Sequence, residues 1–236
     1  MKLPLADAIL ILFDIDGTLL LPKGCGRAAM RLTLLELFQT EADLESHVFG
    51  GKTDWQSMSE LMARHGYDAA DIGRMMPVYE EAVARHLGRI IGDFPVVACP
   101  SAMDTVLALQ DHPRLVPGLL TGNAASIAPI KLRAAGFDPG WFRVGAYGSE
   151  AVSRNDLPAL AVARAEALLQ RRVPAEQVVV IGDTPMDVAC ARAIGAVAVA
   201  VLTGFSNREE LLAAEPDILL DDLSDFFGSV VDSSVY

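Results

Sequence analysis

Residues 8–18 read AILILFDIDGT, an apolar run that ends in two aspartates, a glycine and a threonine. Continuous apolarity is typical of a strand covered on both faces, as in a parallel sheet. Residues two apart in an extended chain point the same way, so we expect Asp14 and Asp16 to face one pocket. Two close carboxylates repel each other unless a cation or a shared proton relieves the repulsion. A plain strand-end turn explains Asp16 and Gly17, but not the acid that closes the buried strand.

Further apolar runs alternate with helical patterns, which predicts a doubly wound α/β core with right-handed crossovers. The first strand is expected at Ala8–Phe13, and the others at Leu115–Leu120, Val144–Tyr147, Gln177–Ile181 and Val197–Leu202. The helices between them are expected at Ala102–Gln110, Ile127–Ala135, Leu157–Leu169 and Met186–Ile194. The fold class is therefore a Rossmann-like parallel-sheet core, which binds ligands at the carboxyl ends of its strands.

The stretch from about Leu21 to Gly92 breaks this alternation. It contains helical patterns only, at Arg27–Phe38, Asp54–His65 and Pro77–Leu87. Segments with glycine and proline at 22–24 and 92–95 bracket it, as paired linkers would. We therefore predict a core domain of residues 1–20 and 93–236, with a small all-helical cap domain of residues 21–92 inserted after the first strand.

Composition and charge limit the expected partners. The 236 residues have a net charge of -12, and such a surface repels nucleic acid and anionic membranes. The three cysteines lack metal-ligand spacing, which suits a reducing compartment. Asp7 and Asp14 bracket the first apolar run too closely for a signal peptide. We expect a cytoplasmic protein that binds a small molecule, with its oligomeric state open.

Thr121-Gly122-Asn123 follows the strand expected at 115–120. A hydroxyl, a backbone amide and a side-chain amide at a strand end can donate hydrogen bonds to an oxyanion such as phosphate. An ordinary strand-to-helix junction, with Asn123 near a helix cap, explains the same residues equally well.

Lys131 lies in the middle of the apolar arc of the helix expected at 127–135, with Ser126 as its cap. A lysine directed at the sheet needs an anionic partner, and the carboxylate cluster around Asp14 could supply it. A surface lysine that extends to solvent is the alternative.

A second acidic motif, Gly182-Asp183-Thr184-Pro185-Met186-Asp187, follows the strand expected at 177–181. Thr184 and Asp187 have the spacing of a capping box, and proline suits the first helical position. Capping explains Asp187 but not Asp183. Together with Asp14 and Asp16, Asp183 makes a third carboxylate at one sheet edge, and oxygen ligands of this kind suit Mg²⁺.

In this order, the motifs at 14–18, 121–123, 131 and 182–187 resemble those of the haloacid dehalogenase superfamily, and more narrowly its phosphoglycolate-phosphatase-like members. The resemblance covers essentially the whole chain, since residues 21–92 match the family's helical cap in position and size. It implies a Mg²⁺-dependent phosphatase that hydrolyses a small phosphorylated metabolite through an aspartyl-phosphate.

The resemblance also implies a role for each motif residue. Asp14 would attack phosphorus, and Asp16 would protonate the leaving oxygen and then activate water. The carboxylates of Asp14 and Asp183 and the backbone carbonyl of Asp16 would hold Mg²⁺, with Asp187 steadying its outer shell. Lys131 would neutralise Asp14 and the transferring group. The residues expected to bind the substrate are Gly17, Thr121, Gly122, Asn123 and Lys52.

Several alternatives stay open. Related phosphatases often carry the motif lysine near the next helix, where this chain has Arg154, so Arg154 is the alternative to Lys131. Lys52 lies in a segment that resembles the family's specificity loop and could reach a substrate carboxylate or hydroxyl, but a helix start capped by Thr53 fits as well. Dehalogenation is disfavoured, because a halide leaving group needs no acid at Asp16. A sugar-phosphate mutase or a catalytically silent binding protein are the other functions considered.

Overall fold

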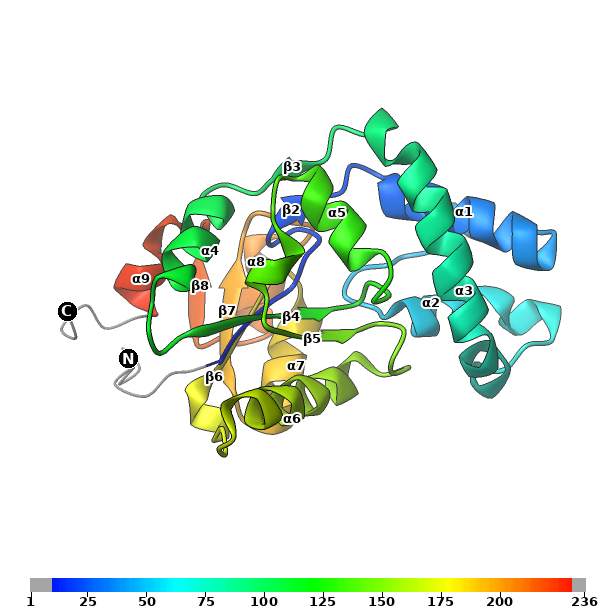
Figure 1. Cartoon of the computed structure of the whole chain (residues 1–236). Helices are drawn as coiled ribbons and strands as arrows, with labels where there is room; N and C mark the ends of the chain where they lie inside the picture. Colours follow the sequence, from blue (N-terminus) through cyan, green and yellow to red (C-terminus); the bar gives the residue numbers. More distant parts are fainter. Residues whose placement is uncertain (1–9, 231–236) are drawn as a thin grey trace.

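A six-stranded parallel sheet forms the centre of the protein. The computed structural model describes residues 10–230, and its strands lie in the order β5-β4-β1-β6-β7-β8 (Figure 1). Each neighbouring pair is parallel. The strands are β1 Leu10–Phe13, β4 Val116–Thr121, β5 Val144–Tyr147, β6 Val178–Gly182, β7 Val197–Val201 and β8 Ile218–Leu220. This topology confirms the predicted fold class; residues 8 and 9 of the expected first strand lie outside the described residues.

Helices cover both faces of this sheet. Alternate residues of β1 enter two separate apolar clusters, Ile11 and Phe13 in one and Leu10 and Leu12 in the other. The first cluster is closed by α4 Ala102–Gln110, α5 Ala128–Ala134 and α9 Phe226–Ser229. The second is closed by α6 Leu157–Leu169, α7 Pro185–Ile194 and α8 Arg208–Ala213. The continuous apolarity of β1 therefore reflects burial on both faces.

Three helices follow β1 along the chain and lie outside the layers of the core. They are α1 Cys25–Phe38, α2 Asp54–Met62 and α3 Ala69–Ile90. Figure 1 shows them together on one side of the molecule, beyond the ends of β4 and β5. The segment of residues 22–96 that contains them is called the insert below. Its division from the core at 20/21 and 92/93 stays a prediction.

A short antiparallel ribbon, which the sequence patterns did not predict, joins the two ends of the insert. It pairs β2 Leu20–Leu21 with β3 Val97–Ala98. Short 3-10 helices also occur within residues 10–230: η1 Ala63–His65, η2 Ile91–Asp93, η3 Pro139–Trp141, η4 Arg154–Asp156, η5 Ala175–Gln177 and η6 Leu223–Asp225. No helix in this described part is long and apolar enough to cross a membrane.

Two helix starts differ from the prediction. A capping box between Asp68 and Asp71 starts α3 at Ala69, so Pro77 lies inside that helix rather than at its beginning. Ser126 was expected to cap α5, but no side chain caps that helix. The Ser126 hydroxyl instead donates to the Glu80 carbonyl, 2.9 Å away, and ties α5 to the insert.

Candidate active site

The carboxyl ends of β1, β4 and β6 meet at a cavity of about 580 Å³ that the insert covers. From the core, the cavity is lined by Asp14, Asp16, Thr121, Gly122, Asn123, Lys131, Arg154 and Thr184, and from the insert partly by His47, Lys52, Asp54 and Tyr79. The motifs predicted from the sequence are therefore brought to one place, at the edge where parallel sheets bind ligands.

Three carboxylates form a group at this edge with the geometry of a cation site. One oxygen from each of Asp14, Asp183 and Asp187 lies within 4.8 Å of the other two, and all three residues are buried. Burial and the neighbouring charges of Asp187 and Asp14 raise the pKa of Asp183 well above its ordinary value. Asp183 Oδ1 is buried and has no partner among residues 10–230. These oxygens fit a hard divalent cation, which would relieve their repulsion.

Glycines make room for the Asp183 carboxylate. A Cβ on Gly17, whose φ is +93°, would lie 2.4 Å from Asp183 Oδ2, and one on Gly204 would lie 1.9 Å from the same oxygen. The Phe205 amide donates to Asp183 Oδ2 at 2.7 Å. Gly17 was predicted to bind the substrate, and the structure places it against an acid of the core.

Arg154 bridges two members of the acidic group. Its Nη2 lies 3.0 Å from Asp14 Oδ1 and 2.6 Å from Asp187 Oδ1, and its side chain is 2% exposed. Burial raises the pKa of Asp14 to about 6, although the Arg154 charge opposes the rise. The other oxygen of Asp187 accepts from the Thr184 amide at 3.0 Å and hydroxyl at 2.6 Å, which confirms the predicted capping box. Asp187 thus has both a capping and an electrostatic contact.

Lys131 is buried and directed at the sheet, as its position in the apolar arc predicted. Its Nζ contacts Asp16 Oδ2 at 2.5 Å and Asn123 Oδ1 at 2.6 Å, so the acid that it pairs with is Asp16 and not Asp14. Asp14 is paired with Arg154 instead. Burial opposes the charged form of Lys131, but Asp16 raises its pKa above the ordinary value.

Asn123 connects the two halves of the predicted phosphate cradle. Its Nδ2 donates to Thr121 Oγ1 at 2.9 Å and to Asp16 Oδ2 at 3.2 Å. Asp16 Oδ1 is buried and lacks a hydrogen-bond partner within the described chain. Because α5 begins only at Ala128, Asn123 does not cap it. The polar atoms of Thr121 and Asn123 are therefore held at the end of β4 beside Asp16.

The start of α2 packs directly on the end of β4. The Asp54 amide donates to the Gly122 carbonyl at 2.8 Å, and Asp54 Oδ2 accepts from the Ala124 amide at 2.9 Å. A Cβ on Gly122 would lie 2.0 Å from the Lys52 carbonyl oxygen. Gly122, predicted to bind the substrate, is thus a contact point for the insert.

Lys52 and Thr53 have different roles in this segment. Thr53 Oγ1 accepts from the Gln56 amide at 2.9 Å and caps α2, as the sequence allowed. Lys52 lines the cavity, but its Nζ lies 2.5 Å from Glu60 Oε2, so an acid of the insert neutralises it.

Two residues of the site were not among those predicted to act in it. Asp54 is partly buried, and the loss of solvent around its carboxylate raises its pKa to about 6. In the sequence, Asp54 looks like an ordinary acidic residue in the first turn of a helix, and the sequence does not show that it contacts Ala124. Tyr79 lines the cavity from the middle of α3 and has only its place in an apolar pattern as a signal.

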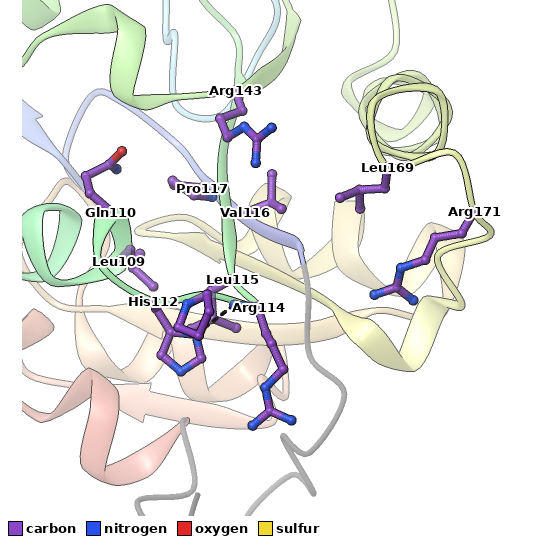
Figure 2. Close-up of a pocket in the computed structure, with 11 residues that line it drawn as sticks. Leu109, Gln110, His112, Arg114, Leu115, Val116, Pro117, Arg143, Leu169 and Arg171 are labelled. Carbon is purple, nitrogen blue, oxygen red and sulfur yellow. Dashed lines mark hydrogen bonds between the residues drawn. The ribbon is translucent and has the colours of Figure 1, made fainter. Parts of the chain in front are cut away.

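A second cavity, of about 360 Å³, lies near the amino end of β4 (Figure 2). Val116 and Pro117 form part of its wall, and the arginines around it are Arg114, Arg143 and Arg171. None of the residues predicted to act in catalysis or binding lines it. The candidate site is therefore the cavity at the carboxyl edge.

Comparison with known proteins agrees with this geometry. Residues 158–226 match the family model of HAD-hydrolase-like (haloacid dehalogenase-hydrolase-like) proteins. A phosphoglycolate phosphatase of Synechococcus elongatus is 28% identical over 228 residues, which cover 93% of this chain and 96% of that protein.

Solved structures share the fold at lower identity. A hydrolase from Pseudomonas syringae superposes with a TM-score of 0.69 at 22% identity, covering 96% of this chain and 100% of the other. CbbY from Rhodobacter sphaeroides, solved in complex with phosphate, superposes with a TM-score of 0.66 at 21% identity, covering 92% and 95%. Together with the sequence matches, they confirm the resemblance that the motifs indicated.

Proposed function

From the likeness of this chain to haloacid dehalogenase-like hydrolases, we propose that it is a Mg²⁺-dependent phosphatase that hydrolyses a small phosphorylated metabolite through an aspartyl-phosphate on Asp14. Hydrolysis of phosphoric monoesters is the activity that the named relative and the site together support. The observation that carries the proposal is the acidic group of Asp14, Asp183 and Asp187, of which Asp14 lines one cavity together with Thr121, Asn123 and Lys131.

Asp14 has the position of a nucleophile in this proposal. It lines the cavity while its Oδ1 is held by Arg154, which fixes the direction of the carboxylate. Attack of a carboxylate oxygen on phosphorus breaks the bond to the leaving oxygen and forms the aspartyl-phosphate. The carboxylates of Asp14 and Asp183 and the backbone carbonyl of Asp16 would hold Mg²⁺, with Asp187 steadying its outer shell, and the ion when bound would supply positive charge that offsets the charge of the phosphoryl group.

Asp16 would transfer the protons. Lys131 and Asn123 hold its Oδ2, and its Oδ1 is the oxygen without a partner in the described structure. Asp16 protonates the leaving oxygen and afterwards accepts a proton from the water that hydrolyses the aspartyl-phosphate.

Thr121 and Asn123 would bind the phosphoryl oxygens, since both place hydrogen-bonding atoms at the end of β4 beside Asp16 and Lys131. Phosphoryl transfer depends chiefly on positioning and charge neutralisation, and these residues with Arg154 supply both. The insert, which covers the cavity, would exclude bulk water during the reaction.

The test is phosphate release from p-nitrophenyl phosphate and a panel of small phosphate esters, with Mg²⁺ and with EDTA. We expect inorganic phosphate with Mg²⁺, loss of activity with EDTA, and recovery when Mg²⁺ is added back. Absence of phosphate release across the panel would overturn the proposal. Isomerisation of a sugar phosphate with the phosphate retained would identify a mutase instead.

A further inference from the structure

Two polar atoms of the insert are buried beside the cavity without a hydrogen-bond partner in residues 10–230, the Tyr79 hydroxyl and Nε2 of His47. Both residues line the cavity. Tyr79 is 1% exposed, and the His47 side chain is 8% exposed. Because a buried polar atom without a partner is unfavourable, two of them in one cavity wall indicate a ligand that supplies the missing hydrogen bonds.

The cations around the cavity are already engaged by groups of the chain. Arg27 donates to backbone carbonyls of the segment 44–47 and lies over the Phe49 ring, 4.7 Å from its centroid. Lys52 Nζ is paired with Glu60 at 2.5 Å. The cations of the core are paired with aspartates, as described above. A carboxylate in the leaving group of the substrate would have to displace an acid from one of the paired cations or compete with the carbonyl groups that Arg27 contacts.

His47 adds no charge to this wall. Burial lowers the pKa of its imidazole, and the neighbouring Lys52 lowers it further, against the smaller opposite effect of Glu60. The ring is therefore neutral at neutral pH and offers one hydrogen-bond donor and one acceptor. A neutral ring of this kind suits a hydroxyl group better than a carboxylate.

Asp54 places negative charge on the same side of the cavity. It is partly buried, and its carboxylate faces the Tyr79 hydroxyl, whose pKa it raises in addition to the effect of burial. An ionised Asp54 repels a carboxylate and accepts a hydrogen bond from a hydroxyl group. The Tyr79 hydroxyl faces Asp54, and a ligand hydroxyl placed beside the two can donate to Asp54 and form a hydrogen bond with Tyr79.

We propose that the leaving group of the substrate is uncharged and bears hydroxyl groups, which Tyr79, His47 and Asp54 bind. The inference rests on the proposed phosphatase function and names the class of its substrate, the phosphate monoester of a small polyol or sugar. A cavity of about 580 Å³ accommodates a molecule of this size. A site that binds hydroxyl groups discriminates strongly against analogues without them, because its buried polar atoms are then left unpaired.

The experiment compares kcat/KM within matched pairs of substrates. Glycerol 3-phosphate and 3-phosphoglycerate differ only by a hydroxymethyl group in place of a carboxylate, as do 2-hydroxyethyl phosphate and 2-phosphoglycolate. We expect the hydroxymethyl member of each pair to be hydrolysed at least about tenfold more efficiently. Equal or faster hydrolysis of the carboxylates, with p-nitrophenyl phosphate also hydrolysed, would overturn this inference alone. No phosphate release even from p-nitrophenyl phosphate would overturn both it and the proposed function.

A substitution that removes one oxygen atom tests whether the Tyr79 hydroxyl binds the substrate. Tyr79→Phe removes only the hydroxyl, and we expect it to lower kcat/KM for glycerol 3-phosphate, relative to that for p-nitrophenyl phosphate, about five- to tenfold. Tyr67→Phe is the matched control, since Tyr67 is exposed on the insert and does not line the cavity, and it should keep the wild-type ratio. A wild-type ratio in Tyr79→Phe would contradict the assignment.

Discussion

Asp14 and Arg154 form an ion pair at 3.0 Å in which the two side chains are 7% and 2% exposed. The same guanidinium nitrogen also contacts Asp187, so one cation serves two of the three clustered acids. Charge pairs of this kind are hard to replace, because removal of one partner leaves an uncompensated charge in the interior.

Arg154→Met should therefore lower the free energy of unfolding by about 3 kcal/mol in the absence of metal, since it leaves the acidic group without a cation. Urea denaturation measures the change. Arg172→Met, at an arginine that is 91% exposed, should change stability by less than about 0.5 kcal/mol. Equal stability of the two variants would show that the buried pair does not hold the acids together.

Asp14→Asn should reduce turnover on the order of a thousandfold or more, because the amide cannot replace the attacking carboxylate. The fold should stay intact, since the change removes a charge from a crowded acidic group. Phosphate release and circular dichroism measure the two effects. Asp111→Asn, at an exposed position, is the control. Activity near wild type in Asp14→Asn would reject its role as the nucleophile.

Metal binding should be visible without turnover. Mg²⁺ should raise the melting temperature of the wild type, and a concentration one hundred times Kd corresponds to about 2.7 kcal/mol. Asp183→Asn should lose most of this shift, because Asp183 contributes an otherwise unpartnered oxygen to the acidic group. An unchanged Mg²⁺ shift in Asp183→Asn would place the metal elsewhere.

Gly122→Ala should disturb the packing of the insert on the end of β4, since the added Cβ would lie 2.0 Å from the Lys52 carbonyl oxygen. We expect a loss of stability of about 1–3 kcal/mol and a raised KM. Gly88→Ala is a matched control in α3, where a Cβ meets nothing within 4 Å, and it should stabilise by about 0.5–1 kcal/mol. Thermal denaturation and kinetics of both variants check the difference.

Asp54 should make stability depend on pH. Burial raises its pKa from 3.8 to about 6, so between these values the folded state holds a proton that the unfolded state has lost. The free energy of unfolding therefore falls as pH rises from 4 to 6, by about 3 kcal/mol in all from this one group. Asp54→Asn, whose amide oxygen can still accept from Ala124, should be free of this loss. Urea denaturation at pH 4 and pH 7 measures the free energy of unfolding of both proteins. The stability of Asp54→Asn relative to the wild type should be higher at pH 7 than at pH 4. The same difference at both pH values would contradict the assignment.

The sequence predicted β1, β4, β5, β6 and β7 because each is a continuous apolar run followed by a turn, but it did not predict the edge strand β8. It missed the β2–β3 ribbon, since two-residue strands leave no periodic signal. It placed the start of α3 at Pro77, because proline is common in the first turn of a helix. The true start is set by the capping box at Asp68, nine residues earlier, where no pattern of large apolar residues signals a helix.

At the site, residues with two explanations were the hardest to assign. The apolar arc around Lys131 predicted its burial, but its pairing with Asp16 instead of Asp14 depends on Arg154, which approaches from η4. Gly122 looked like a phosphate contact because it stands between Thr121 and Asn123. Its contact with Lys52 joins segments about 70 residues apart, and a single sequence shows no such proximity.

The β2–β3 ribbon brings the two ends of the insert together at one point beside the main sheet. Leu20 pairs with Ala98 and Leu21 with Val97, so a gain or loss of residues between them leaves the register of β1 with β4 and β6 unchanged. The length of the insert can consequently change without moving the strands that carry Asp14 and Asp183, whereas its contacts with Gly122 and Ser126 would have to be kept. Replacement of the helical segment between β2 and β3 would change which substrates enter the cavity while the strands of the sheet stay in place.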